Sequence, residues 1–243
     1  MYLAPFIGFA LASTCATVSA SALIPRALSV DEMLAFVDGE IQVVNKAAYL
    51  TETDNLMPPP NFTHSLHNRD TFDSSLVKRD CKRKQDIIVS TNIQRFLGDD
   101  VPMSTAIKAD STDVTIAVTD GYEIGNSITT STTGSLNFFS EMLGISFGVE
   151  KGRTWTSSYS TAYTFTVPKG KYGVVVSNLW TNRHEGYKMT GCVGEVGEKI
   201  SYSSDSYESG EYSKLSWPKG TISICISEEY PVKKCRGDGF VDS

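Results

Sequence analysis

The chain has 243 residues, of which 40% are hydrophobic, and its formal net charge is −6 at pH 7. Residues 80–243 carry 17 Lys and Arg against 20 Asp and Glu, so they lack the positive field that nucleic-acid binding needs. We therefore expect no nucleic-acid partner, and the length suffices for one domain with a core of its own.

Residues 1–22 have the pattern of a secretory signal peptide. An apolar run at residues 3–12 is followed by small residues, and Ala20 and Ala22 alternate in the way that signal peptidase prefers. The run is too short to span a bilayer, which takes about 20 residues. We therefore expect a secreted, extracellular protein, because no later segment is long and apolar enough for a transmembrane helix.

Residues 23–79 differ in character from the rest and are predicted to form a small pro-segment. Ser29 and Glu32 have the spacing of a capping box before an apolar stripe, which predicts a helix over residues 30–37. The sequence GEIQVV at residues 39–44 predicts a short strand.

The end of this pro-segment has the features of a processed linker. Three consecutive prolines at residues 58–60 exclude a helix and favour an extended chain. Asn61 begins the only N-glycosylation sequon of the chain. Lys78 and Arg79 then form a dibasic pair of the kind that eukaryotic secretory proteases cut, so we expect a Lys-Arg-specific protease to act there.

Cysteine parity favours this cut over one at a second dibasic pair, residues 82–83. After the signal peptide the chain has four cysteines, an even number that suits an oxidising compartment. The first cut keeps all four, whereas the second removes Cys81. We therefore expect residues 80–243 to be the mature domain.

Four cysteines allow three disulfide patterns. Cys81 and Cys235 lie near the two ends of the mature domain, and the ends of a domain are often close together. We expect Cys81–Cys235 and Cys192–Cys225, because Cys192 and Cys225 lie in strand-like runs that can be neighbours. The alternative is Cys225–Cys235.

The expected mature domain has the composition of a β protein. Short runs of alternating apolar and polar residues, or of β-branched and aromatic residues, are separated by Gly, Asp and Pro. Strands are predicted at residues 113–120, 143–149, 154–167, 170–180, 201–217 and 221–227, with turns at 120–121, 150–153, 168–170 and 218–220. A turn or two of helix is predicted around residues 138–143. The pattern predicts an all-β, single antiparallel domain of the sandwich type.

The stretch from residue 127 to residue 167 has unusual two-sided strands. Residues 127–135 include seven Ser or Thr, and along residues 154–167 an aromatic face alternates with a hydroxyl face. Such strands suit a soluble sandwich whose aromatic face packs in the core, or a pore-forming hairpin whose aromatic face meets lipid and whose hydroxyl face lines a wet lumen. We expect the sandwich. The candidate binding or membrane face is Trp155, Tyr159, Tyr163, Phe165 and Trp180.

Several motifs in a fixed order resemble one family. They are the Lys-Arg pair, VTIAVTDGYEIGNS, RTWTSSYSTAYTFTVPKGKYGVVVSNLW, a Gly-Cys pair, SDSY and a closing CISEEYPVKKC. This order resembles secreted effector-like proteins of filamentous ascomycete fungi, the Celp effector-like group, over essentially the whole chain. The resemblance implies a fungal virulence factor that acts on a host, and it supplies no catalytic residue. In texture alone the strands are similar to those of aerolysin-type pore-forming toxins, which implies an elongated domain.

Residues suited to catalysis or metal binding are scarce in the expected mature domain. His184 is its only histidine, and oxidised cysteines leave no Cys/His pair or multi-histidine metal site. Three acidic pairs occur, Asp99-Asp100, Glu195 with Glu198, and Glu228-Glu229. Since sequence neighbours usually point to different places, these pairs favour a solvated surface over a catalytic dyad. We expect no enzyme activity, no cofactor and no metal.

Three functions remain open from the sequence. The first is a disulfide-stapled β protein that binds a host protein, a glycan or a membrane as an effector or toxin, and we expect this one. The second is a β-hairpin pore former, and the third is a hydrolase with an unrecognised site. The tripeptide Arg236-Gly237-Asp238, which animal integrins bind, is expected to be displayed on the C-terminal tail.

Overall fold

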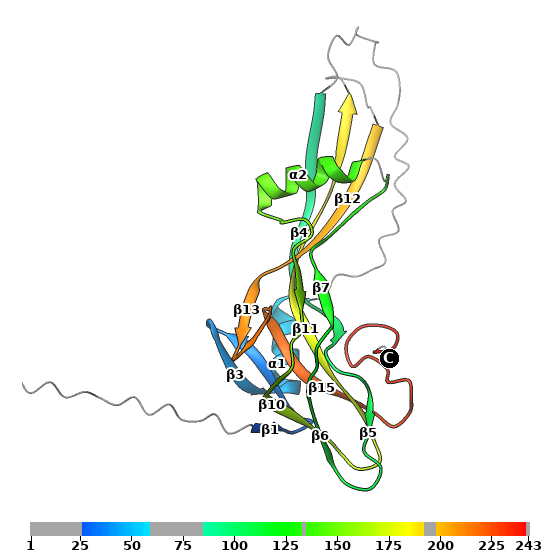
Figure 1. Cartoon of the computed structure of the whole chain (residues 1–243). Coiled ribbons are helices and arrows are strands. Elements are labelled where there is room, and N and C mark those ends of the chain that lie inside the picture. Colours follow the sequence, from blue (N-terminus) through cyan, green and yellow to red (C-terminus); the bar gives the residue numbers. More distant parts are fainter. Residues whose placement is uncertain (1–25, 59–84, 133–134, 192–197, 242–243) are drawn as a thin grey trace, which may run out of the picture.

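The computed structural model describes residues 26–58, 85–132, 135–191 and 198–241. The fold class predicted from the sequence is confirmed: the described chain is mostly β, with antiparallel sheets in a sandwich-like arrangement and two short helices. Figure 1 shows a body of packed sheets from which a long arm of strands extends. Neither described helix is long and apolar enough to span a membrane.

One large sheet runs through both body and arm, and β11 (Tyr172–Gly191) is its central strand. Its order is β3 (Glu40–Asn45), β2 (Glu32–Val37), β15 (Gly220–Ser227), β11, β12 (Glu198–Tyr207) and β8 (Ser127–Thr130), and β4 (Gln85–Pro102) and β5 (Ile107–Lys108) also pair with β11. In the body β11 pairs with β15, and farther along it pairs with β12 and β4. The arm consists of residues 85–95 of β4, 182–191 of β11 and 198–206 of β12 (Figure 1).

Smaller sheets and two helices complete the molecule. A three-stranded sheet contains β1 (Arg26–Leu28), β10 (Ser160–Val167) and β6 (Val114–Val118), and two further pairs are β13 (Ser209–Tyr212) with β14 (Leu215–Pro218) and β7 (Glu123–Gly125) with β9 (Thr154–Thr156). Helix α1 (Lys46–Leu56) follows β3, and helix α2 (Leu136–Phe147) lies across the arm (Figure 1).

The body and the arm have separate apolar clusters. The main core brings Val175 and Leu179 of β11 together with Phe165 of β10, Ile116 of β6 and Trp217 of β14. A second cluster forms where α2 packs on the arm. A third covers the opposite side of β11 with the C-terminal loop, and it contains Val174, Val176, Cys225, Val232 and Val241. Because β11 is covered on both sides in the body, its Val-rich run is buried throughout.

Most of the predicted strands are present. The predictions at residues 39–44, 113–120, 170–180 and 221–227 are confirmed as β3, β6, β11 and β15, and the run at 201–217 contributes to β12, β13 and β14. Strand β11 continues to Gly191, well beyond its predicted end, because its outer half pairs with two long partners.

The helix predicted over residues 30–37 is wrong, because this segment forms strand β2. The capping-box contact does exist, since Glu32 Oε2 accepts a hydrogen bond from the backbone N–H of Ser29 at 3.1 Å. However, residues 33–35 are buried in succession between β3 and β15, and successive burial suits an internal strand rather than a helix with one apolar face.

Helix α1 is absent from the sequence prediction. Asn45 caps its N-terminus, because its side-chain oxygen accepts a hydrogen bond from the backbone N–H of Ala48 at 3.0 Å. Thr53 is the one buried residue of this helix, so the sequence contains no apolar stripe by which it could be found.

The strand predicted at residues 143–149 is also wrong, because residues 136–147 form helix α2. The expected turn or two of helix at residues 138–143 is confirmed as part of it. Phe139 and Leu143, four residues apart, are fully buried, whereas Ile145 is 81% exposed. The helix ends at Gly148, whose φ of 67° is the left-handed conformation typical of a glycine cap.

The long strand predicted at residues 154–167 is divided into β9 and β10. The side chain of Ser157, between them, accepts a hydrogen bond from the backbone N–H of Tyr122 at 3.0 Å and donates one to the carbonyl of Thr119 at 2.6 Å. These bonds take the chain out of the strand, and β9 and β10 therefore pair with different partners, β7 and β6.

The predicted disulfides Cys81–Cys235 and Cys192–Cys225 are wrong, because Cys225 and Cys235 are bonded to each other. The C-terminal loop folds back over β15, and Asp100 Oδ2 accepts hydrogen bonds from the backbone N–H groups of Cys235, at 2.6 Å, and Arg236, at 3.0 Å. This return brings the two sulfurs together across only ten residues.

The remaining processing and cysteine predictions fall outside the described residues. They concern the signal peptide, Asn61, the Lys78-Arg79 pair, Cys81 and Cys192. Residues 26–58 belong to the expected pro-segment, yet they are part of the same sheets as the expected mature domain.

Candidate functional site

The predicted aromatic face does not form one surface. Trp155, Phe165 and Trp180 are buried, with 6%, 0% and 8% of their surface exposed, and Tyr163 is half-buried. Tyr159, in the turn between β9 and β10, is 64% exposed. The five residues therefore do not form one exposed face in this structure. Packing of the aromatic residues in a sandwich core is confirmed for Trp155 and Phe165, and it is wrong for Tyr159.

Helix α2 and the side of the arm beneath it form the more distinctive feature. Phe139 and Leu143 of α2 are fully buried against Ile200 and Tyr202 of β12. The rings of Phe139 and Tyr202 are 4.8 Å apart between centroids, within the range of favourable aromatic pairs. The helix is therefore held by an apolar cluster that is separate from the main core.

Gly186 of β11 makes room for this cluster. A Cβ atom at this position would lie 2.1 Å from the carbonyl oxygen of Val89 and 2.9 Å from the ring of Tyr202. The pairing of β4 with β11 also shifts register between Glu185 and Gly186, as at a β-bulge. A glycine is required here because the strand backbone and the Tyr202 ring approach each other closely.

Lys188 supports α2 from the arm. Its ammonium nitrogen lies 4.0 Å from the centroid of the Phe138 ring and 3.0 Å from a carboxylate oxygen of Asp86. A cation over an aromatic ring contributes about 0.5–2 kcal/mol, depending on how far it is shielded from water. The lysine side chain is only 14% exposed, so the contact is partly shielded.

His184 of β11 lies under the C-terminal end of α2. Its ring centroid is 4.4 Å from that of Phe147, and burial lowers the pKa of His184 below its ordinary value. Among the described residues, neither His184 Nδ1 nor the hydroxyl of Ser204, its register partner on β12, has a hydrogen-bond partner. Among the same residues, the hydroxyl of Tyr202, at the Phe139 end of the helix, likewise has no partner, and each unpaired buried polar group costs about 1–3 kcal/mol.

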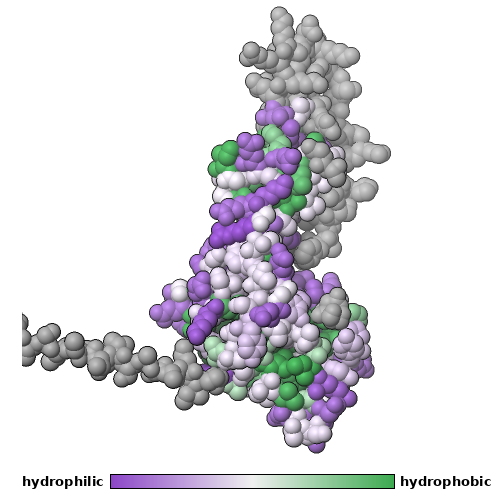
Figure 2. All heavy atoms as spheres, viewed as in Figure 1, coloured by the Kyte–Doolittle hydropathy of each residue, from purple (hydrophilic) through white to green (hydrophobic). Residues whose placement is uncertain are grey.

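Apolar side chains are exposed beside the same end of α2. Ile145 is 81% exposed and Phe147 is 38% exposed. Ile93 of β4 lies opposite His184 in the register, so it shares the side of the arm that faces α2, and it is 60% exposed. Figure 2 shows hydrophobic surface flanking the helix on the arm. We call Ile93, Ile145 and Phe147 the arm patch.

The opposite side of the arm has paired polar groups on its half nearer the body, and Tyr187 with Val89 farther out. Arg183 donates two hydrogen bonds of 2.6 Å to the carboxylate of Asp205, and Asn92 donates one of 3.1 Å to Glu185. The ion pair raises the pKa of Arg183, chiefly through its hydrogen bond to Asp205. Helix α2 and the arm patch therefore lie on one side of the arm, and these polar pairs lie on the other.

The described polar groups near the body have structural roles. Asp100 is buried and holds the C-terminal loop through two accepted hydrogen bonds. Asp100, Cys225 and Cys235 lie close enough together to hold a metal ion, but the two sulfurs form a disulfide and offer no thiolate. An open groove of about 570 Å³ along α1 is lined by one carboxylate, Glu52, which supplies no acid–base pair.

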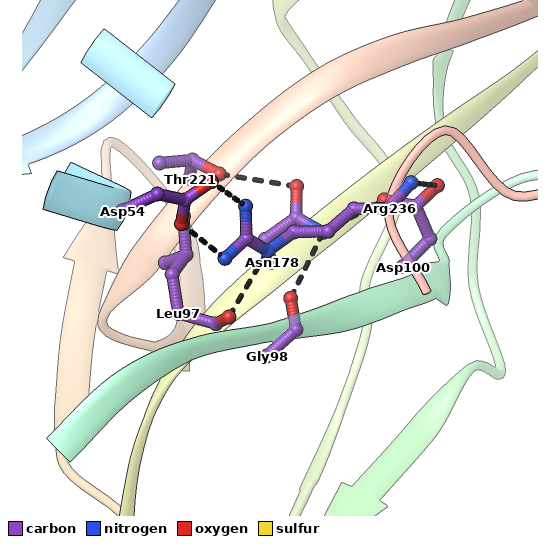
Figure 3. Close-up of polar contacts among 7 residues, drawn as sticks. All are labelled: Asp54, Leu97, Gly98, Asp100, Asn178, Thr221 and Arg236. Atoms are coloured by element: carbon purple, nitrogen blue, oxygen red, sulfur yellow. Dashed lines mark hydrogen bonds and ion pairs between the residues drawn. The ribbon is translucent and has the colours of Figure 1, made fainter. Parts of the chain in front are cut away.

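The Arg-Gly-Asp tripeptide is not displayed in the way expected from the sequence. The guanidinium of Arg236 donates hydrogen bonds of 2.6 and 3.0 Å to the two carboxylate oxygens of Asp54 (Figure 3). Its Nε donates a further bond of 3.0 Å to the carbonyl of Leu97. Gly237 and Asp238 are exposed, but the arginine is occupied.

Comparisons with protein-family models, with curated proteins and with solved structures find no match to this chain.

The arm patch was missed by the sequence analysis, which assigned Ile145 and Phe147 to a strand. The buried pair Phe139 and Leu143, with Gly148 as a cap, is the signal that could have identified the helix.

Proposed function

We propose that the protein is a secreted, non-enzymatic effector-like or toxin-like factor that binds the surface of a target cell through the arm patch. The observation that carries this proposal is the exposure of Ile93, Ile145 and Phe147 together on one side of a projecting arm. Exposed apolar clusters on secreted proteins are typical contacts for proteins or membranes. Their chemistry favours a membrane or a host protein over a glycan.

The non-enzymatic part of the proposal is supported by the engagement of the candidate polar groups. Asp100 holds the C-terminal loop, and Arg236 is bonded to Asp54. The Cys225–Cys235 disulfide is compatible with an extracellular location, where such bonds persist. Cleavage after Lys78-Arg79 by a secretory protease stays part of the proposal, and N-terminal sequencing of secreted protein should give Asp80-Cys81-Lys82.

Substitution of Ile145 tests the contact directly. Secreted protein is titrated onto intact cells and onto vesicles of phosphatidylcholine and sterol. Burying one isoleucine contributes about 1.5–3 kcal/mol, so Ile145→Ser should weaken binding by tenfold or more. Leu56→Ser is the matched control, because Leu56 is 70% exposed on α1 in the body. Equal binding by Ile145→Ser and the unsubstituted protein would refute the proposed contact.

A second candidate function is pore formation by residues 127–167. Two features favour it. Helix α2 is attached to the arm through a cluster that is separate from the main core. In the sequence, the helix lies between the Ser/Thr-rich residues 127–135 and the hydroxyl-rich strand β10. The part that carries α2 can leave the arm while the body stays folded, whereas Trp155 of β9 would have to leave the main core. The charges at Glu150, Lys151 and Arg153 would have to cross the bilayer, which weighs against insertion.

An engineered disulfide distinguishes the two candidates. Thr129 of β8 lies opposite Ser203 of β12, and directly opposite residues of antiparallel strands have Cα atoms about 4.5–5.5 Å apart, which suits a disulfide. The double variant Thr129→Cys with Ser203→Cys therefore locks residues 127–130 to the arm. Glu211→Cys with Ser216→Cys is the matched control, since it links the β13–β14 pair in the body.

A further inference from the structure

Residues 26–58 are built into the body on the edges of two sheets. Strand β2 pairs with β15, with Ala35 opposite Thr221 and Leu34 opposite Ile222. Strand β1 pairs in parallel with β10, with Leu28 opposite Phe165. These pairings join the segment to strands more than 130 residues farther along the chain.

The segment also supplies side chains to the main core. Leu28, Met33 and Ala35 are fully buried, and Leu34 is 2% exposed. Leu28 and Leu34 belong to the same cluster as Phe165 and Trp217. Removing the segment would therefore expose apolar residues of the core and would leave the β15 edge without its neighbour.

Polar contacts fix the rest of the segment to the C-terminal half. The ammonium group of Lys46 donates a hydrogen bond of 2.7 Å to the carbonyl of Ile224 on β15. Asp54 of α1 accepts two hydrogen bonds from Arg236, which also bonds to Leu97 (Figure 3). The arginine side chain is only 14% exposed, so this bidentate ion pair is partly shielded from water.

We propose that residues 26–58 remain bound after the chain is cut, as a separate chain that donates strands β1 and β2 to the body. The surface made by the edges of β15 and β10 is then a strand-acceptor site, and its partner is this segment. The biological setting rests on the proposed cleavage after Lys78-Arg79, but the interface itself does not. It follows that processing yields a two-chain protein and leaves the arginine of Arg236-Gly237-Asp238 occupied.

The test uses the full chain with a recognition site for a sequence-specific protease inserted after residue 66, so that it does not depend on the natural processing enzyme. The cut protein is passed through a size-exclusion column in native buffer and, separately, in denaturant. We expect the two chains to elute together in native buffer and to separate only in denaturant. Elution of the small chain by itself in native buffer would overturn the proposal.

The Asp54–Arg236 contact gives a second measurement. Labelled peptide 26–58 is added in excess to the cut protein, and the rate at which it replaces the bound segment is followed. Removing one member of a shielded charge pair mainly speeds dissociation, so Asp54→Asn should exchange at least about tenfold faster. Glu52→Gln, the same change two residues away on α1, should exchange at the unsubstituted rate. Equal rates for the two variants would refute the role of the ion pair.

These outcomes are separate from those of the cell-binding experiment. The column and exchange measurements contain no target surface, whereas the Ile145→Ser experiment needs no cleavage. A protein that keeps its two chains together but binds no cell would sustain this inference and refute the proposed function. A protein that binds cells through the arm patch but loses its small chain in native buffer would sustain the proposed function and refute this inference.

Discussion

Replacing Phe139 by alanine should release α2 from the arm while the body stays folded. Phe139 is fully buried, and its ring lies 4.8 Å from that of Tyr202 and 5.5 Å from that of Phe138. None of these three residues belongs to the main core. The free energy lost by this substitution therefore falls on the local opening of the helix rather than on global unfolding.

The expected size follows from the burial of the ring. Truncating a buried phenylalanine to alanine costs about 3–5 kcal/mol, including its aromatic contacts. Each 1.4 kcal/mol is about a factor of ten in an equilibrium constant, so the open state of α2 should become about a hundred- to a few thousandfold more populated.

Hydrogen exchange measured by mass spectrometry resolves this change along the chain. Amides of residues 138–147 should exchange faster by that factor, whereas amides of β15 should keep their protection. Phe240→Ala is the control, because Phe240 is 49% exposed outside the arm. Faster exchange in β15 to the same extent as in α2 would refute the separation of the two clusters.

Three further predictions concern the arm and the C-terminal loop. Burial lowers the pKa of His184 in the folded protein below its ordinary value of 6.5, so the unfolded chain binds more protons below that pH and the free energy of unfolding should fall on acidification. In urea titrations, His184→Gln should lose less stability between about pH 7 and pH 5 than the unsubstituted protein does. An equal loss in both proteins would count against the lowered pKa of His184. Gly186→Ala should lower the free energy of unfolding by about 1–3 kcal/mol, because the new Cβ would lie 2.1 Å from the Val89 carbonyl oxygen. The change is measured as a lower urea midpoint, and an unchanged midpoint would contradict the close approach of the two strands. A peptide map of non-reduced protein should contain the pair Cys225–Cys235, and finding either cysteine with another partner would refute the loop geometry.

The β character of the protein could be predicted because it depends on local patterns. Alternation at residues 113–120 and the Val-rich run at 170–180 identify β6 and β11 wherever their partners lie. The confusion at residues 143–149 has an equally local cause, since positions i and i+4 share a side in a strand and nearly so in a helix. Exposure of Ile145 depends on which side of α2 meets the arm, and this is decided by Tyr202, far along the chain.

The place of residues 26–58 could not be predicted for a different reason. Strand β2 is specified by its pairing with β15, and β1 by its pairing with β10, so the deciding partners are distant in sequence. The local Ser29–Glu32 contact forms as predicted but is followed by a strand. An even number of cysteines likewise predicts that disulfides form but not which cysteines pair, so Cys225–Cys235 was only one of the alternatives.

Dye release from vesicles of phosphatidylcholine and sterol, measured together with binding, tests most directly whether the protein acts by surface binding. The account predicts that the protein binds and that the dye stays inside, with or without the lock between positions 129 and 203. The account would be contradicted by dye release that depends on freeing residues 127–130 from the arm. In that case the protein without the lock releases dye, the lock abolishes the release, and reduction of the lock restores it. The control disulfide between positions 211 and 216 would then leave the release unchanged.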